Sequence, residues 1–196
     1  MVVMGLLEVF NLAVLTAAIG YIFTGYVRSP ETTGLSRKFR FSWNDFKFAL
    51  LVAAPGVVLH ELAHKFVALG FGLGAVFHVW YPGLGIAIFL KLINSPFLLI
   101  APGYVSIGDS SGILTPFLEN FSSVLVSFAG PAINLIIWLI SGYVLHNAKR
   151  LTRNQASALY LTKKINMLLF AFNMIPIPPL DGSKVLFGLF KLVFNL

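Results

Sequence analysis

Residues 46–70 read FKFALLVAAPGVVLHELAHKFVALG, and this stretch decides the fold. It is long enough for a helix that crosses the hydrocarbon core of a bilayer, which takes roughly 20 predominantly apolar residues. The same stretch carries His60, Glu61 and His64. Because ionisable side chains are costly inside a bilayer, each of these three is a candidate functional group. The stretch therefore predicts a membrane-spanning helix that also carries chemistry.

The composition of the whole chain is that of a membrane protein. Of its 196 residues, 58% are hydrophobic and 11% are charged, and the mean hydropathy is +0.87. A soluble domain has about 25% charged residues, so an ordinary water-soluble domain and a disordered chain are both excluded. The basic residues behind the net charge of +7 fall in short loops, so we expect no nucleic acid among the partners. The chain has no cysteine, and a bound metal therefore needs histidine and carboxylate ligands.

Further apolar segments predict a membrane all-α bundle of four to five transmembrane helices, which forms a single polytopic domain over residues 1–196. The apolar segments lie at 1–27, 46–70, 121–146, 165–180 and 183–196, and the polar linkers lie at 28–45 and 147–164. The first segment lacks the basic n-region of a signal peptide and is too long for one, so we interpret it as a retained helix. The expected location is the lipid bilayer of the cell membrane, which the chain crosses several times.

Residues 71–120 differ from the segments around them. Dense glycine and proline punctuation argues against one continuous helix, and β-prone runs stand at 75–81 and 97–100. The apolar run 84–93 covers only about half of a span. Because non-helical backbone at membrane depth has to be buried in protein or line a water-filled cavity, we expect a small strand-rich or re-entrant layer beside the helices.

The pattern H-E-x-x-H at 60–64 is the first of three candidate site motifs. Residues four apart share one face of a helix, so the rings of His60 and His64 can reach one zinc ion. Glu61 lies about 100° round the helix and can act as general base towards the water that zinc activates. A catalytic zinc site usually has three protein ligands plus water, so a third ligand has to come from elsewhere.

The stretch NMIPIPPLDG at 173–182 offers that ligand. Its prolines, of which Pro176 is the first, break or kink the helix, and this lets Asp181 project into the bundle. Gly182 permits a tight turn directly afterwards. The alternative is that Asp181 only caps the last helix, since aspartate is a favoured cap. The zinc motif lacks its third ligand, which favours the ligand interpretation.

The stretch AGPAIN at 129–134 is the third motif. Gly130 allows close approach of another helix, and Pro131 loosens the hydrogen-bond ladder. Asn134 is a donor and acceptor within an apolar helix and needs a partner. One interpretation is an interhelical hydrogen bond; the other is contact with a substrate carbonyl or the developing oxyanion.

The three motifs, in this order and each in an apolar helix, resemble those of the site-2 proteases, which are intramembrane zinc metalloproteases. The resemblance covers a three-helix catalytic core at 46–182. It implies that His60, His64 and Asp181 bind one zinc ion per chain and that Glu61 activates the water.

The resemblance also implies an activity, which is the hydrolysis of peptide bonds in or near transmembrane segments of other membrane proteins. Asn134 and Asn173 would position the substrate or polarise its carbonyl. Members of this family commonly have a membrane-associated sheet after the first motif, which fits 71–120. Such a sheet would pair with an unwound substrate by strand addition, because the amides of a helical substrate are shielded by their own hydrogen bonds.

Two other interpretations of the metal motif remain open. In the first interpretation, the chain is a zinc-binding membrane protein without proteolytic activity. Its closed metal site would need a fourth ligand, such as His78. In the other it is a different zincin, for which Glu119 is the candidate third ligand.

The orientation in the membrane also has two answers. The positive-inside rule places the basic linkers 28–45 and 147–164 in the cytoplasm and the H-E-x-x-H motif nearer the other side. The resemblance implies an active site that opens near the cytosol. Both expectations place the three motifs on the membrane side opposite the basic linkers.

Overall fold

The computed structural model describes residues 4–24, 26–27, 41–93, 95, 103–108 and 115–194. Within these ranges six helices and two strands follow one another. In chain order they are α1 (Leu6–Phe23), α2 (Trp43–Gly70), β1 (Ala75–Val79), α3 (Tyr81–Leu92), β2 (Gly103–Ile107), α4 (Pro116–Asn147), α5 (Arg153–Asn173) and α6 (Asp181–Phe194).

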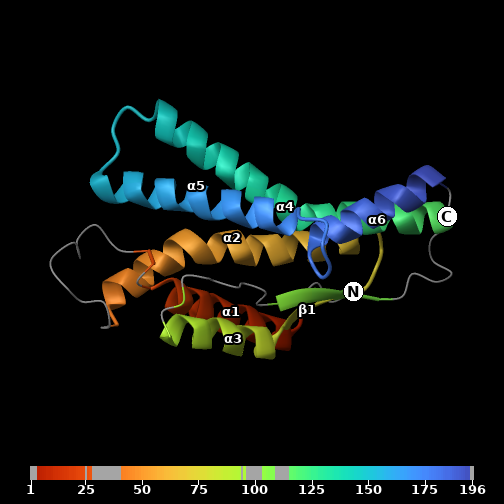
Figure 1. Ribbon diagram of the computed structural model, residues 1–196, viewed down its shortest axis with the longest axis horizontal. Helices are drawn as coiled ribbons and strands as arrows, with labels where there is room; N and C mark the ends of the chain where they lie inside the picture. The colour runs from red at the N-terminus through yellow and green to blue at the C-terminus, as the bar shows by residue number, and fades with distance from the viewer. Residues whose placement is uncertain are drawn as a thin grey trace.

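Helix α2 lies at the centre of the bundle (Figure 1). Helices α4 and α5 pack on one side of it and α1 on the other, with α3 beside α1. Ala49 and Ala53 on α2 are fully buried in one core cluster with Leu15 and Ile19 of α1. Because alanine has a small side chain, the two backbones can approach closely. The helix that carries the H-E-x-x-H motif is therefore enclosed between two layers of protein.

Three helices of the described chain are long and apolar enough to cross a membrane, namely α1, α2 and α4. Helix α6 has 14 residues, which is too short for a span on its own. Helix α5 has 21 residues, but its first half is polar. The predicted count of four to five spans is therefore not confirmed among the described residues.

Helix α5 begins earlier than the hydropathy pattern indicates. Thr152 and Gln155 form a capping box, in which the Gln155 backbone N–H donates to Thr152 Oγ1 and the Thr152 N–H donates to Gln155 Oε1. This reciprocal pair satisfies two N–H groups at the helix start. The interpretation of 147–164 as a linker is consequently wrong for most of its length.

The segment after α2 contains the predicted break in helical structure. Strands β1 and β2 form an antiparallel two-stranded sheet in which Phe77 lies opposite Val105. The β-prone run at 75–81 is therefore confirmed for most of its length, whereas the run at 97–100 lies outside the described residues. The apolar run at 84–93 lies largely in α3, so the layer holds a short helix as well as strands.

One end of the bundle collects the elements that carry the three motifs. The C-terminal ends of α2 and α5, the sheet and α6 gather there, and the connection between α4 and α5 lies at the opposite end (Figure 1). Helix α6 packs against α4 at this end. Residues that are far apart in the sequence are therefore brought to one place.

Candidate metal centre

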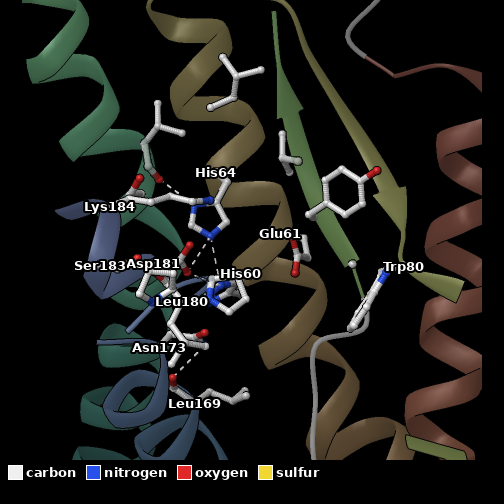
Figure 2. Close-up of a pocket in the computed structure, with 18 of the residues that line it drawn as sticks. His60, Glu61, His64, Trp80, Leu169, Asn173, Leu180, Asp181, Ser183 and Lys184 are labelled. Atoms are coloured by element: carbon white, nitrogen blue, oxygen red, sulfur yellow. Dashed lines mark hydrogen bonds and ion pairs between the residues drawn. The ribbon is translucent and has the colours of Figure 1, made fainter. Parts of the chain in front are cut away.

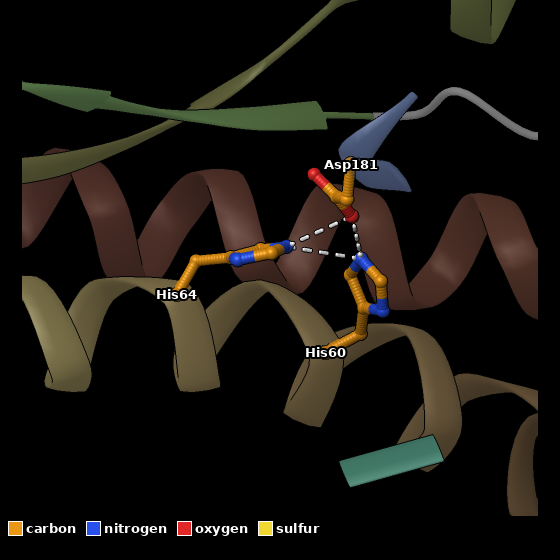
Figure 3. Close-up of side chains that lie close together, drawn as sticks. All are labelled: His60, His64 and Asp181. Atoms are coloured by element: carbon orange, nitrogen blue, oxygen red, sulfur yellow. Dashed lines mark hydrogen bonds and ion pairs between the residues drawn. The ribbon is translucent and has the colours of Figure 1, made fainter. Parts of the chain in front are cut away.

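His60 and His64 lie one turn apart on α2, and their rings meet Asp181 (Figure 3). Their Nε2 atoms are 3.1 Å apart. Oδ2 of Asp181 is 3.2 Å from Nε2 of His60 and 3.3 Å from Nε2 of His64. Both histidines are buried. In the part of the chain that the structure describes, these three residues form the group of histidine and carboxylate side chains close enough to hold a metal ion.

The break between α5 and α6 delivers Asp181 to the histidines. Residues 174–180 turn the chain, and Asp181 is the first residue of α6. A Cβ atom at Gly182 would lie 2.8 Å from the carbonyl oxygen of Ile175, so only glycine allows this close approach of α6 to the turn. Asp181 thus stands in the first turn of its helix and also beside both histidines. This position of the carboxylate agrees with the ligand interpretation drawn from the sequence.

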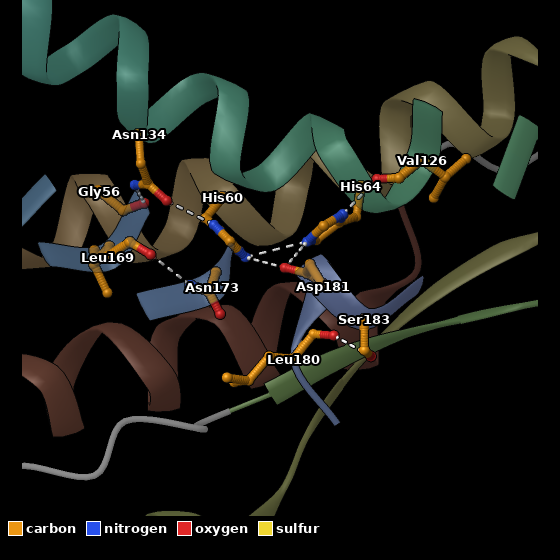
Figure 4. Close-up of polar contacts among 10 residues, drawn as sticks. All are labelled: Gly56, His60, His64, Val126, Asn134, Leu169, Asn173, Leu180, Asp181 and Ser183. Atoms are coloured by element: carbon orange, nitrogen blue, oxygen red, sulfur yellow. Dashed lines mark hydrogen bonds and ion pairs between the residues drawn. The ribbon is translucent and has the colours of Figure 1, made fainter. Parts of the chain in front are cut away.

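Hydrogen bonds fix which nitrogen of each imidazole carries the proton (Figure 4). Nδ1 of His64 lies 2.7 Å from the carbonyl oxygen of Val126, which can only accept, so Nδ1 is the donor. Nδ1 of His60 lies 2.6 Å from Oδ1 of Asn134 and donates to it, because the amide nitrogen of Asn134 is used for other bonds. In a neutral imidazole the lone pair is then on Nε2. Both lone pairs point at the carboxylate of Asp181.

This donor set fits a zinc ion. Zinc binds aspartate as the deprotonated carboxylate and histidine as the neutral imidazole, and Asp181, His60 and His64 offer these donor types. Two lone pairs and an anionic oxygen repel one another unless a cation lies between them. A tetrahedral ion with ligand bonds of about 2.0–2.1 Å has ligand atoms about 3.3–3.4 Å apart, close to the observed separations. A histidine that binds a metal through one ring nitrogen typically donates the N–H of its other ring nitrogen to an acceptor.

Gly130 lets α4 approach the two imidazoles. A Cβ atom built on it would lie 2.7 Å from Nε2 of His60 and closer still to Nε2 of His64. Pro131, the next residue, is fully buried within α4. The third motif, at 129–134, therefore brings a stretch of α4 without a side chain against the ligand rings.

Asn134 lies behind His60, on the side away from Asp181 (Figure 4). It is fully buried, and its Nδ2 donates to the carbonyl oxygen of Gly56 at 3.0 Å and to Oδ1 of Asn166 at 2.8 Å. Asn166 is also fully buried and donates to the carbonyl oxygen of the residue four before it. A chain of hydrogen bonds thus runs from α5 through α4 to the ring of His60.

Asn166 was missed in the sequence analysis. It carries the same signal as Asn134, an amide within an apolar segment that needs a polar partner. Asn173, the last residue of α5, donates to the carbonyl oxygen of Leu169 at 3.0 Å and lines the cavity described below. Pro176 is exposed in the turn before α6 and does not line this cavity.

Replacement of Asn134 by leucine is expected to weaken zinc binding about 10- to 100-fold, since the side chains that orient metal ligands act on this scale. The change leaves Nδ1–H of His60 without an acceptor. Asn166→Ala is expected to weaken binding less, because Asn134 keeps its bond to Gly56. Competition with a chromophoric chelator measures both affinities. Equal zinc affinity in Asn134→Leu and the wild type would contradict the orienting role.

A cavity of about 780 Å³ opens beside the metal ligands (Figure 2). Its walls come from α2, β2, α4, the end of α5 and the start of α6. Glu61 is buried in its wall between the ligands and Trp80 (Figure 2). The cavity therefore combines a candidate metal centre, a carboxylate outside the ligand set and an extended strand.

Comparison with known proteins assigns this arrangement to a family. The sequence model of a family described as Peptidase family M50 matches residues 145–195, which include Asp181. A putative zinc metalloprotease of Methanocaldococcus jannaschii is 33% identical over 183 residues, which is 91% of this chain and 83% of the relative. A putative zinc metalloprotease of Bacillus subtilis is 31% identical over 153 residues, which is 71% of this chain and 67% of the relative.

The chain belongs to peptidase family M50, the site-2 protease family. The resemblance seen in the three motifs is thereby confirmed. No solved structure matches the chain.

Proposed function

We propose that this protein is a zinc endopeptidase that cleaves peptide bonds in or near transmembrane segments of other membrane proteins. The supporting observation is the position of Glu61, next to the ligand set and in the wall of a cavity between apolar helices and a strand. Both relatives are named as zinc metalloproteases. Three apolar helices support a protein that crosses a membrane several times, and we propose that this membrane is the cell membrane.

In this proposal His60, His64 and Asp181 hold one zinc ion. When bound, zinc supplies a Lewis acid that polarises the scissile carbonyl and makes water more acidic. Glu61 accepts the proton of the attacking water on its carboxylate and then donates it to the nitrogen of the leaving amine. The buried wall around Glu61 limits bulk water and strengthens these electrostatic effects.

Asn134 and Asn173 have different parts in the proposal. Asn134 is a positioning residue that holds His60, because the structure turns its amide towards the ring and buries it fully. Asn173 lines the cavity and offers its carboxamide oxygen to a substrate amide. The proposal therefore keeps substrate positioning for Asn173, and for Asn134 it adopts the interhelical hydrogen bond, the other interpretation drawn from the sequence.

The edge of β2 is the proposed binding site for the substrate backbone. The N–H of Gly108 donates to the carbonyl oxygen of Gly74 at 2.6 Å. Hydrogen-bonded and non-hydrogen-bonded pairs alternate along an antiparallel sheet, so Val105, opposite Phe77, belongs to a non-hydrogen-bonded pair. Its N–H and carbonyl point away from β1. Gly103, Val105 and Ile107 line the cavity, and an extended peptide can pair with them.

The alternatives are less well supported by the geometry. A closed structural zinc site needs a fourth protein ligand, and among the described residues the metal group contains three. His78, the candidate for that place, stacks on Tyr104 and lies 3.0 Å from Ser106 Oγ. Glu119 is exposed in the first turn of α4 and is not in the metal group.

Removal of the metal tests the proposed function. The purified full chain, stripped with a chelator, is expected to lose cleavage of an unstructured apolar peptide and to regain it when zinc is returned. Asp181→Ala is expected to lose bound zinc, because two imidazoles alone leave the site one ligand short. Cleavage that persists without metal would refute a zinc peptidase. If Asp181→Ala still bound zinc fully, Asp181 would not be a ligand, and the motifs at 60–64 and 173–182 would not share one metal site.

A further inference from the structure

A buried ion pair outside the metal site joins α1, α2 and β1. Lys65, the residue after His64, is 1% exposed, and its ammonium donates to Oε1 of Glu8 on α1. The same oxygen accepts the backbone N–H of Phe77 on β1 at 2.8 Å. Oε2 of Glu8 accepts the backbone N–H of Gly5 at 2.8 Å. The proposed chemistry uses none of these groups.

The contact with Phe77 lies on the outer edge of the sheet. Among the described residues, β1 pairs with β2 alone, so an N–H of Phe77 that reaches Glu8 points away from β2. The hydrogen bond between Gly108 and Gly74 also places Phe77 in a non-hydrogen-bonded pair, whose N–H points away from the partner strand. Unpaired groups along a strand edge are a template for another chain. The carboxylate of Glu8 accepts the hydrogen bond of this edge at the centre of β1.

Stability alone does not account for an ion pair at this place. Charged residues are costly in membrane-spanning segments, and apolar side chains of similar size are often as stable as a buried ion pair. A leucine and a methionine would pack α1 on α2 but would offer no acceptor to Phe77. The carboxylate does both, since one oxygen binds α2 and β1 together.

We propose that Glu8 and Lys65 form a clamp that positions the sheet relative to the metal ligands and closes the outer edge of β1 to substrate. The proposal rests on the proposed function, because it treats the sheet as the platform for the peptide. Lys65 is adjacent to His64 in α2. One turn of this helix therefore carries a metal ligand and also the cation of the clamp that positions the sheet. A peptide then adds at the edge of β2, beside Glu61, and not at the edge of β1.

Two double variants without the charge pair isolate the contact with Phe77. Glu8→Gln combined with Lys65→Met keeps a carbonyl oxygen that can accept the Phe77 N–H. Glu8→Leu combined with Lys65→Met has no such acceptor and is otherwise matched. The leucine variant is expected to have a KM at least ten-fold above that of the glutamine variant, with equal kcat and equal zinc content. Its Phe77 amide is expected to exchange hydrogen at least ten-fold faster.

The same measurement on the wild type does not depend on whether a variant folds. The Phe77 amide is expected to exchange slowly and the Val105 amide rapidly, although both residues lie at the centre of their strands. Equal KM and equal Phe77 exchange in the two double variants, or fast exchange at Phe77 in the wild type, would overturn the clamp. If the wild type cleaves no peptide, the proposed function fails, and hydrogen exchange alone still decides on the clamp.

Discussion

Replacement of Glu61 by glutamine is expected to lower the rate of peptide cleavage about 1,000-fold or more, within the range attributed to general acid–base groups, and to leave zinc bound. Glutamine has nearly the same shape but cannot accept the proton of the attacking water. Glu61 is not part of the ligand group, so the donor atoms of His60, His64 and Asp181 stay in place. Cleavage rates and zinc content of the purified variant measure the two effects separately.

Glu119→Gln is the matched control. It makes the same chemical change at an exposed carboxylate in the first turn of α4, and both cleavage and zinc content should stay at the wild-type level. A loss of zinc in this control would support the alternative in which Glu119 is the third ligand. Wild-type cleavage by Glu61→Gln would rule out Glu61 as the base.

The metal ligands were predictable because their signals are local. His60 and His64 share a helix face at a spacing that the sequence shows directly. Asp181 follows a cluster of prolines, which break or kink a helix, and the incomplete zinc motif then pointed to it. What the sequence does not contain is the distance between the two motifs, which results from the packing of α6 on α4 and of α4 on α2.

The features that were missed depend on long-range contacts. Glu8 and Lys65 are far apart in the chain, and their pairing requires α1 to lie beside α2. The hydrogen bond between Asn166 and Asn134 likewise joins two helices. The start of α5 was misplaced for a different reason, because its polar first half is stabilised by a capping box and by packing on α4 and not by an apolar pattern.

Gly130→Ala is expected to weaken zinc binding by at least about 100-fold, at the upper end of the effects of groups around a metal site, and to abolish cleavage. The added methyl group would overlap the rings of His60 and His64, which cannot withdraw because Asn134 and Val126 hold their Nδ1 atoms. Inside a helix alanine is otherwise more favourable than glycine by about 1 kcal/mol. Any loss of zinc therefore comes from the steric overlap and not from helix propensity.

Gly142→Ala makes the same change in the same helix, but further along α4 and away from the metal ligands. A Cβ atom there would meet the side chain of Lys163 at 3.4 Å, which the flexible end of a lysine can accommodate. This control is expected to bind zinc and cleave peptide as the wild type does. If Gly130→Ala bound zinc as tightly as Gly142→Ala, the close approach of α4 to the imidazoles would not be needed for the metal centre. A loss of zinc in Gly130→Ala alone would instead show that the third motif, at 129–134, acts on the metal centre through the space that its glycine leaves for the imidazoles.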